Sequence, residues 1–283
     1  MMLVCAGAVA IAPPAQASTP MYIGAVGDVA PLANSINAPL GTHAYAHFQE
    51  KVPSGRMITV EADGSWANVA GASVGSALYD NIVRWARTLK SRPGRTMLAY
   101  HHEPEASSDG NLGGPSNFIA AWRRVVTIFR AEGVQNVVFT WQMTAWSFRT
   151  SPSDPRYAAK WYPGDAYVDN IGADAYNWYT CGHGKGRWTE LKTLVDPVLA
   201  FARAHGKPAS LPEFASFADS RRAQWLRNAH QYLVANRSVL SAAFYFQQFP
   251  TNSANSDCRW KLTTSAEFDA YHDIARDSAY FTT

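Results

Sequence analysis

Charged side chains are scarce in this chain, because Lys, Arg, Asp and Glu together make up 17% of its 283 residues and the formal net charge is only +3. The lysines and arginines are scattered rather than clustered. A nucleic-acid partner would require a basic stripe that neutralises phosphates, and the sequence contains none, so we expect no such partner. Aromatic residues reach 13% and include ten tryptophans, a balance that favours a neutral, hydroxyl-rich ligand.

Long hydrophobic runs are also missing. Residues 1–12 are apolar but too short to span a bilayer, and Pro13 and Pro14 interrupt the run. Ala15-Gln16-Ala17 has the small-x-small form of a secretory cleavage site, which predicts a signal peptide over residues 1–17. The usual basic beginning is absent, which leaves open a start further upstream or a terminus of another kind. We expect a secreted protein without a membrane partner.

Cysteine is rare. Loss of residues 1–17 would remove Cys5 and leave Cys181 and Cys258, which in an oxidising compartment suggest one disulfide, with two unrelated free thiols as the alternative. These two residues offer too few ligands for a metal. His101-His102-Glu103 does not complete the zinc-protease helix motif, because Ala106 stands where the second histidine would be. We expect no metal and no other cofactor.

Two further signatures are absent. No Gly-x-Ser-x-Gly elbow is present, which argues against an esterase. Gly24 and Gly27 lack the third glycine and the acidic residue of a dinucleotide-binding fold, which argues against an open, doubly wound sheet. No linker, repeat or low-complexity tract follows Ser18, so residues 18–283 are expected to form a single domain.

Short apolar runs alternate with amphipathic segments from Met21 onward. Helical stripes run through residues 79–89 and 118–129, and Asp196-Pro197 has the form of a helix start. The expected strands are Tyr22–Val26, Met57–Glu61, Thr96–His102, Val137–Trp141, Asn170–Tyr176, Ala209–Phe214 and Ala242–Gln247, with a short eighth between Gly41 and Phe48. This order predicts an α/β fold, a closed (β/α)8 TIM barrel.

The ends of these strands carry the chemistry, since a barrel of this kind gathers its functional residues at the C-terminal ends of its strands. Polar or aromatic residues close several otherwise apolar strands: Glu61, His102, Glu103, Glu105, Trp141, Asp174, Tyr176, Glu213 and Gln247. Glycoside cleavage needs two carboxyl groups, and Glu103 and Glu213 supply them at two strand ends. A salt bridge and a solvated loop residue are the bland alternative for this pair.

Glu105 competes with Glu103 for the acid role because both have the same strand parity, but Pro104 disfavours continuation of the ladder. Trp66 and Trp178 flank strand ends, and a flat apolar ring matches the C–H face of a pyranose. We expect these two tryptophans, together with Gln247, to bind substrate. Packing in the core or in a loop is the alternative for each tryptophan.

Four stretches resemble glycoside hydrolase family 26, the β-mannanase-type members of the retaining barrel clan. They are Tyr100-His101-His102-Glu103, Phe118–Arg130 with Val137–Trp141 after it, Trp161–Tyr176 and Leu211–Phe214. The resemblance implies that Glu103 is the acid/base and Glu213 the nucleophile. It also implies that His102 hydrogen-bonds near the reacting sugar, that Tyr176 touches the nucleophile and that Trp141 forms an aromatic wall of the cleft. Pro104-Glu105 and Ala215 depart from the family's usual residues.

The sequence therefore predicts a monomeric, secreted, endo-acting retaining hydrolase whose partner is a β-linked polysaccharide, with β-1,4-mannan as the first candidate. Two alternatives stay open. One is a non-catalytic carbohydrate-binding barrel, and the other is the same mechanism acting on β-glucan or β-xylan.

Overall fold

The structure is a computed structural model that describes residues 20–106, 112–249, 257–278 and 281–283. The expected signal peptide at residues 1–17 lies outside these described residues. Within the described ranges, no helix has both the length and the apolar character needed to cross a membrane.

Eight parallel strands close into a barrel in the described part of the chain, which confirms the predicted (β/α)8 fold. They are β1 (Met21–Gly27), β2 (Gly41–His47), β3 (Met57–Glu61), β4 (Thr96–Tyr100), β5 (Val137–Thr144), β6 (Asn170–Asn177), β7 (Ala209–Ser216) and β8 (Leu240–Gln247). Each strand pairs with the next, and β8 pairs with β1 to close the ring. A short β9 (Phe281–Thr282) pairs with the first two residues of β1.

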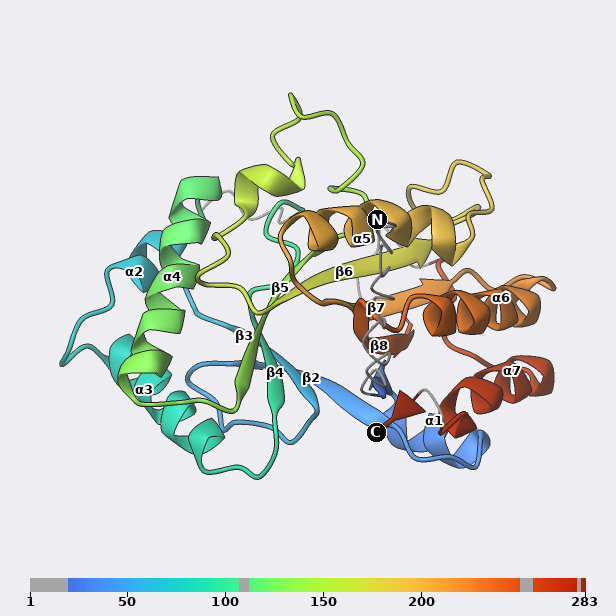
Figure 1. Ribbon diagram of the computed structural model, residues 1–283, viewed down its shortest axis with the longest axis horizontal. Coiled ribbons are helices and arrows are strands. Elements are labelled where there is room, and N and C mark those ends of the chain that lie inside the picture. Colours follow the sequence, from blue (N-terminus) through green and yellow to red (C-terminus); the bar gives the residue numbers. More distant parts are fainter. Residues whose placement is uncertain (1–19, 107–111, 250–256, 279–280) are drawn as a thin grey trace, which may run out of the picture.

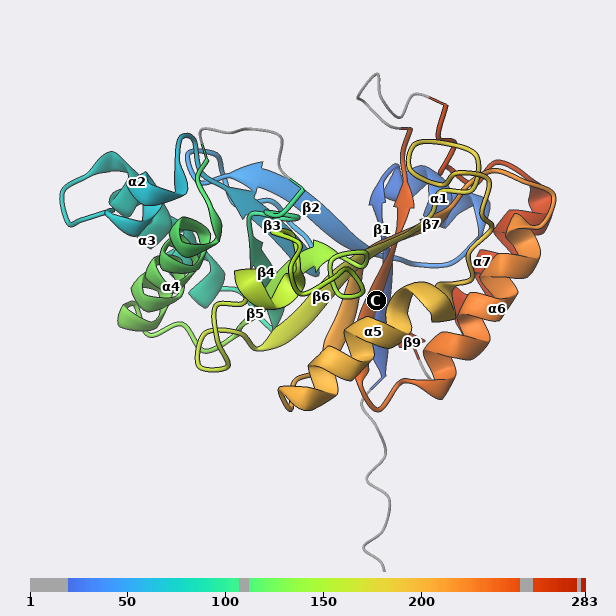
Figure 2. The same cartoon turned by 90° about the horizontal axis from the view of Figure 1, so that it is seen from above.

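Helices lie between the strands and cover the outside of the barrel. They are α1 (Val29–Ser35), α2 (Trp66–Ala70), α3 (Ala77–Lys90), α4 (Pro115–Ala131), the 3-10 helix η1 (Ala158–Trp161), α5 (Leu191–Ala204), α6 (Arg222–Ala235) and α7 (Ser265–Arg276). Helices α2 to α4 lie on one side of the strands, and α5 to α7 lie on the other (Figures 1 and 2). Thr264 and Glu267 form a reciprocal capping box that starts α7.

The start of α5 differs from the prediction. Asp196-Pro197 does not open the helix, because α5 begins at Leu191 with Glu190 as its N-cap residue and contains Pro197 in its interior. Asp196 instead pairs with Lys192 one turn earlier and accepts a hydrogen bond from Tyr232 at 2.8 Å. The free energy gained by burying the apolar face of α5 outweighs the cost of the backbone hydrogen bond that Pro197 cannot donate.

Neighbouring strand residues face opposite sides of the barrel wall. Met57 and Met97 belong to a small buried cluster, whereas the adjacent Ile58 and Leu98 belong to the large cluster that also contains buried helix residues. This alternation follows from the two-residue period of a strand. Because the strands are parallel, the polar residues at their C-terminal ends lie together at one end of the barrel.

Candidate active site

Glu103 follows β4 through an unusual turn. The strand ends at Tyr100, and His101 and Glu103 then adopt left-handed backbone conformations with φ of 54° and 43°. Such conformations are costly for residues with a Cβ, so the surroundings must hold this turn in place. The Glu103 amide donates to the Gln142 carbonyl oxygen on β5 at 3.1 Å, which fixes the turn to the next strand.

Glu213 lies within β7, and its side chain is only 7% exposed. The pairing of β7 is irregular on both sides: the register shifts between Leu211 and Phe214 against β8, and β6 shows a matching shift. Pro212 causes part of this irregularity because it has no amide to donate to the ladder, and its carbonyl oxygen lies 2.9 Å from Nδ1 of His43 instead. Irregular pairing re-aims the side chains next to it.

Two tyrosines bind Glu213, one at each carboxylate oxygen. Tyr45 donates its hydroxyl to Oε1, and Tyr176 donates its hydroxyl to Oε2. Tyr176 was the expected neighbour, but Tyr45 was missed because β2 was the weakest strand prediction. The available signal was the alternation of His43, Tyr45 and His47 along β2.

A third carboxyl group, Asp174 on β6, completes a polar network in the barrel. Gln142 donates from Nε2 to both oxygens of Asp174, at 3.1 and 2.8 Å, and accepts from Thr59 through Oε1 at 2.9 Å. Asp174 in turn hydrogen-bonds Glu103. Burial, followed by the charges of Glu213 and Glu103, raises the pKa of Asp174 well above its usual range. Two carboxyl groups in contact favour a shared proton.

The surroundings of Glu103 suit a proton donor. Burial, opposed by the charge of His102 and aided by the charges of Glu213 and Glu105, raises the pKa of Glu103 to about 8. His102 lies on the same turn, with its Nδ1 3.0 Å from Oε1 of Glu61. A carboxyl group with this pKa keeps its proton at neutral pH, as a general acid requires.

Glu105, the rival for the acid role, has different neighbours. Its Oε1 accepts hydrogen bonds from the Thr144 amide at 2.8 Å and the Thr144 hydroxyl at 2.6 Å, and its side chain is buried. Thr144 is the last residue of β5, so these bonds anchor Glu105 to the neighbouring strand. Its position therefore leaves Glu103 as the glutamate of this turn that contacts Asp174.

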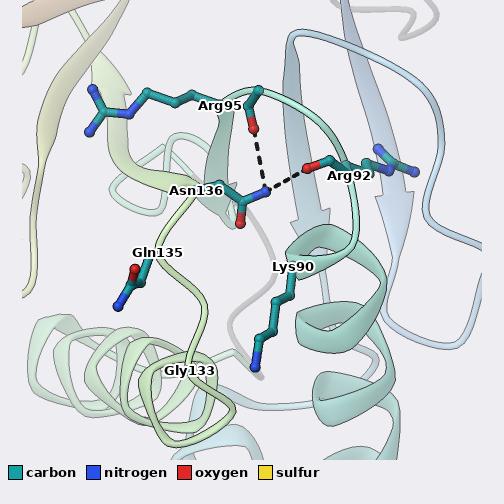
Figure 3. Close-up of a pocket in the computed structure, with 7 residues that line it drawn as sticks. Lys90, Arg92, Arg95, Gly133, Gln135 and Asn136 are labelled. Carbon is teal, nitrogen blue, oxygen red and sulfur yellow. Dashed lines mark hydrogen bonds between the residues drawn. The ribbon is translucent and has the colours of Figure 1, made fainter.

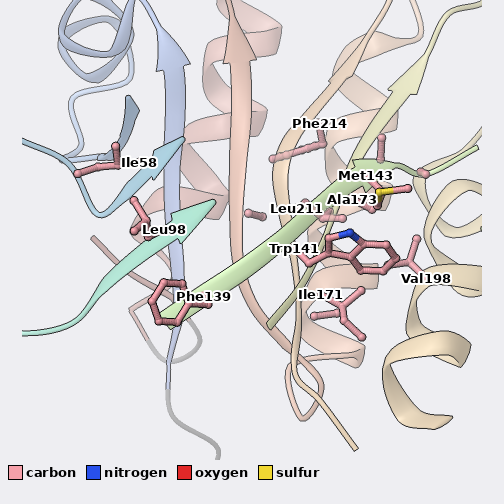
Figure 4. Packing of buried hydrophobic residues seen from close by; sticks show 14 of the residues in the cluster. Ile58, Leu98, Phe139, Trp141, Met143, Ile171, Ala173, Val198, Leu211 and Phe214 are labelled. Atoms are coloured by element: carbon pink, nitrogen blue, oxygen red, sulfur yellow. The ribbon is translucent and has the colours of Figure 1, made fainter. Parts of the chain in front are cut away.

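Trp141 is not at the mouth of the barrel, which corrects its expected place in a cleft wall. It is fully buried, and its ring centroid lies 4.9 Å from that of Tyr162 and 5.8 Å from that of Phe201. Figure 4 shows its side chain extending from β5 toward Val198 of α5. Because β5 runs on to Thr144 and Gln142 faces the barrel interior, the alternation turns Trp141 outward.

Trp66 and Gln247 are likewise part of the scaffold, which corrects their expected place at the substrate. Trp66 starts α2, is 1% exposed and packs edge-on against Phe118 with centroids 5.4 Å apart. The Gln247 side chain donates to the Leu262 carbonyl oxygen at 3.2 Å and accepts from the Leu262 amide at 2.9 Å. Both of its polar groups are therefore occupied by the chain itself.

Trp178 packs beside Tyr176, the tyrosine that donates to Glu213. It follows β6 directly, is partly exposed, and its ring centroid is 5.6 Å from that of Tyr176 and 5.2 Å from that of Trp260. A disulfide between Cys181 and Cys258 links the loop after β6 to the segment that carries Trp260.

A possible metal cluster and a basic pocket can both be set aside. Cys181, Asp257 and Cys258 form the group of potential metal ligands found in the described ranges, but both sulfurs are in the disulfide. At the opposite end of the barrel, a pocket next to the starts of β4 and β5 is lined by Lys90, Arg92, Gly94, Arg95, Gly133, Gln135 and Asn136 (Figure 3). Lys90 and Arg92 donate there to main-chain carbonyl oxygens, so they stabilise loops and helix ends.

Comparison with known sequences points to one family. The family model described as glycosyl hydrolase family 26 matches residues 71–243, more than half of the chain. Endoglucanase H of Acetivibrio thermocellus is 28% identical over 151 residues, which are 53% of this chain and 16% of that protein. Beta-1,3-xylanase TXYA of a Vibrio species is 23% identical over 265 residues, which are 85% of this chain and 52% of that protein. The chain thus spans about half or less of these curated relatives.

Solved structures share the fold. A GH26 beta-mannanase from Bacteroides ovatus superimposes with a TM-score of 0.61 at 15% sequence identity, covering 93% of this chain and 90% of that one. A modular endo-beta-1,4-mannanase from Cellulomonas fimi gives a TM-score of 0.53 at 20% identity, covering 80% and 55%. At these identities the likeness concerns the barrel alone.

Proposed function

Because the chain belongs to glycosyl hydrolase family 26, we propose that it cleaves a β-linked polysaccharide by a retaining mechanism that uses Glu103 and Glu213. The observation that supports this proposal is the contrast between the two carboxyl groups. Burial and neighbouring charges favour the protonated form of Glu103, whereas both oxygens of Glu213 accept hydrogen bonds from tyrosines. Different surroundings can give two identical side chains opposite roles.

In the first step, Glu213 attacks the anomeric carbon while Glu103 donates its proton to the leaving oxygen, and a glycosyl-enzyme ester forms. In the second step, Glu103 accepts a proton from the water that releases the sugar. Retention requires the two carboxyl groups to lie about 5–5.5 Å apart, as against roughly 6.5–9.5 Å for inversion. His102, Tyr176 and Trp178 are proposed to contact the sugar, since His102 and Tyr176 interact with these glutamates and Trp178 packs against Tyr176.

The substrate proposed first is β-1,4-mannan, because the family 26 proteins of similar fold from Bacteroides ovatus and Cellulomonas fimi are mannanases. The curated relatives are named as an endoglucanase and a β-1,3-xylanase, so β-glucan and β-xylan are the alternatives to test. We propose that the enzyme acts outside the cell as a monomer. The disulfide and the signal-like residues 1–17 support export.

The test is a panel of mannan, glucomannan, mixed-linkage β-glucan, β-1,4-xylan and β-1,3-xylan, with release of reducing ends as the readout. Wild type should hydrolyse at least one polymer, and Glu213→Ala should lose that activity. Glu132→Gln, a surface glutamate that pairs with Arg87 on the outer helices, is the matched control and should keep it. NMR of the fresh product should show retained anomeric configuration. Full activity in Glu213→Ala, an inverted product, or sugar binding without turnover would contradict the proposal.

A further inference from the structure

Glu213 starts the proposed reaction with both of its carboxylate oxygens occupied by tyrosine hydroxyls, Tyr45 at Oε1 and Tyr176 at Oε2. The oxygen that bonds to the anomeric carbon becomes an ester oxygen and loses its negative charge. The sugar then occupies the space beside this oxygen. Hydrogen bonds to a charged acceptor are roughly twice as strong as those to a neutral one. One of the two tyrosines must therefore release Glu213 when the covalent bond forms.

Tyr176 is held firmly in place. Its ring centroid lies 4.9 Å from Trp260, 5.6 Å from Trp178 and 5.8 Å from Phe246, so aromatic rings pack against it from three residues. Trp260 is itself anchored, because the buried guanidinium of Arg222 donates to its carbonyl oxygen at 3.2 Å. Movement of the Tyr176 hydroxyl would disturb this whole packed group.

Tyr45 is much freer. It is 38% exposed, near the C-terminal end of β2, and its hydroxyl nevertheless reaches the buried Glu213. Its ring centroid lies 4.7 Å from that of His43 and 5.2 Å from that of His102 in an edge contact. The exposed ring therefore bridges the nucleophile and the residue that precedes the acid, which is where a reacting sugar must lie.

We propose that Tyr45 is a further catalytic residue, which holds Oε1 of Glu213 in the resting enzyme and transfers its hydrogen bond to a hydroxyl of the sugar when Oε1 attacks. This inference deepens the proposed function and rests on it. Tyr176 stays on Oε2, which becomes the carbonyl oxygen of the ester, and so orients the intermediate.

The proton balance of this exchange is simple. As the bond from Oε1 to the anomeric carbon forms, the glycosidic bond breaks and the proton of Glu103 goes to the leaving oxygen. Tyr45 keeps its own proton and changes only its acceptor. When water attacks the anomeric carbon, its proton goes to Glu103, Oε1 leaves as a carboxylate oxygen and Tyr45 returns to it.

The test compares Tyr45→Phe with wild type on whichever panel polymer wild type hydrolyses. Tyr45→Phe removes the hydrogen bond to the sugar hydroxyl that forms only as Oε1 attacks, so kcat should fall by roughly threefold to tenfold. KM should change less than twofold, because the bond serves the reacting atoms rather than resting substrate. Labelling of Glu213 by a 2-deoxy-2-fluoro aryl glycoside, followed by mass spectrometry, should slow in parallel.

Tyr232→Phe is the matched control, because it also removes a tyrosine hydrogen bond to a carboxylate, that of Asp196 at 2.8 Å on the outer helices, and it should leave kcat unchanged. An unchanged kcat in Tyr45→Phe, a change confined to KM, or a loss of activity that only follows a fall in melting temperature would overturn the role of Tyr45. In each case the loss of activity in Glu213→Ala would leave the two-glutamate mechanism standing. An inactive wild type would remove both proposals.

Discussion

His102 and Glu61 form a close pair beside the proposed acid, with Nδ1 of His102 3.0 Å from Oε1 of Glu61. Burial alone would lower the pKa of His102, but the hydrogen bond to Glu61 and the charges of Glu103 and Glu213 together raise it to about 9. The imidazolium is therefore present at neutral pH, and its charge pulls the pKa of Glu103 downward against the effect of burial. Glu61, at the end of the neighbouring strand β3, keeps His102 charged and so lowers the proton affinity of Glu103.

This relationship gives a pH prediction. A general acid works while protonated, so kcat/KM of wild type should fall as the pH rises through about 8, the pKa of Glu103. His102→Asn removes a positive neighbour, which raises the pKa of Glu103 and should move the basic limb to higher pH, with a lower maximal rate. His205→Asn, which breaks a histidine–aspartate pair with Asp165 on the outer surface, should leave the limb in place. A limb that moves to lower pH in His102→Asn would contradict this account.

The raised pKa of Glu103 also predicts that ionisation of this carboxyl group lowers the stability of the folded wild-type protein. Between pH 4.5, the ordinary value, and about pH 8, the folded protein binds more protons at Glu103 than the unfolded chain does, so stability falls as the pH rises. Glu103→Gln has no such loss. Its melting temperature should exceed that of wild type at pH 8 by a few degrees, corresponding to roughly 2–4 kcal/mol, and the gain should shrink at pH 5.

Glu132→Gln is the control for that experiment, because Arg87 holds the pKa of the Glu132 carboxyl below its usual value. Glu132→Gln should have a small effect of the opposite sign, a melting temperature slightly below that of wild type above pH 4.5. Equal melting temperatures of Glu103→Gln and wild type from pH 5 to pH 8 would show that Glu103 is not strained by burial.

Arg222 predicts a large stability effect far from the reacting atoms. It is fully buried, pairs with Glu267 at 2.8 Å and donates to the carbonyl oxygens of Arg259, Trp260 and Lys261. Arg222→Met leaves a buried carboxylate and these carbonyl oxygens without a partner, which should cost about 3–5 kcal/mol in urea unfolding. The adjacent Arg221→Met removes an exposed pair with Asp219 and contacts of the guanidinium with the rings of Tyr179 and Trp188, and it should cost much less than Arg222→Met. Equal effects of the two substitutions would refute this stabilising role of Arg222.

The positions of Glu103 and Glu213 could be predicted from the sequence because a parallel barrel brings all strand ends to one face, so recognition of the strands was enough. The direction of individual side chains was harder. Strand β5 continues three residues beyond Trp141, its expected last residue. When the end of a strand is misplaced, the sequence does not tell which of its side chains face inward and which outward. Trp141 was therefore placed at the substrate although it packs against α5.

Contacts between distant strands were the other limit. Tyr45 belongs to a strand without an all-apolar run, and its partner Glu213 is 168 positions later in the chain, so no local pattern could connect them. Asp174 was visible as a polar strand end, but its hydrogen bond to Glu103 depends on the relative depth of two non-adjacent strands. Such pairs are fixed by the closure of the barrel and not by spacing.

The disulfide between Cys181 and Cys258 predicts that a reducing agent weakens the folded protein. The bond closes a loop with a sequence separation of 77, and the lost entropy of the unfolded chain corresponds to about 4 kcal/mol. Reductant should therefore lower the melting temperature of wild type by several degrees, measured by calorimetry, and should have no effect on a Cys181→Ser/Cys258→Ser double variant, which should melt at the lower temperature throughout.

Because Trp260 follows Cys258 closely and packs against Tyr176, kcat should fall in the reduced protein even below its melting range. If reductant lowers the melting temperature but leaves kcat intact, Arg222 alone is sufficient to hold Trp260 against Tyr176.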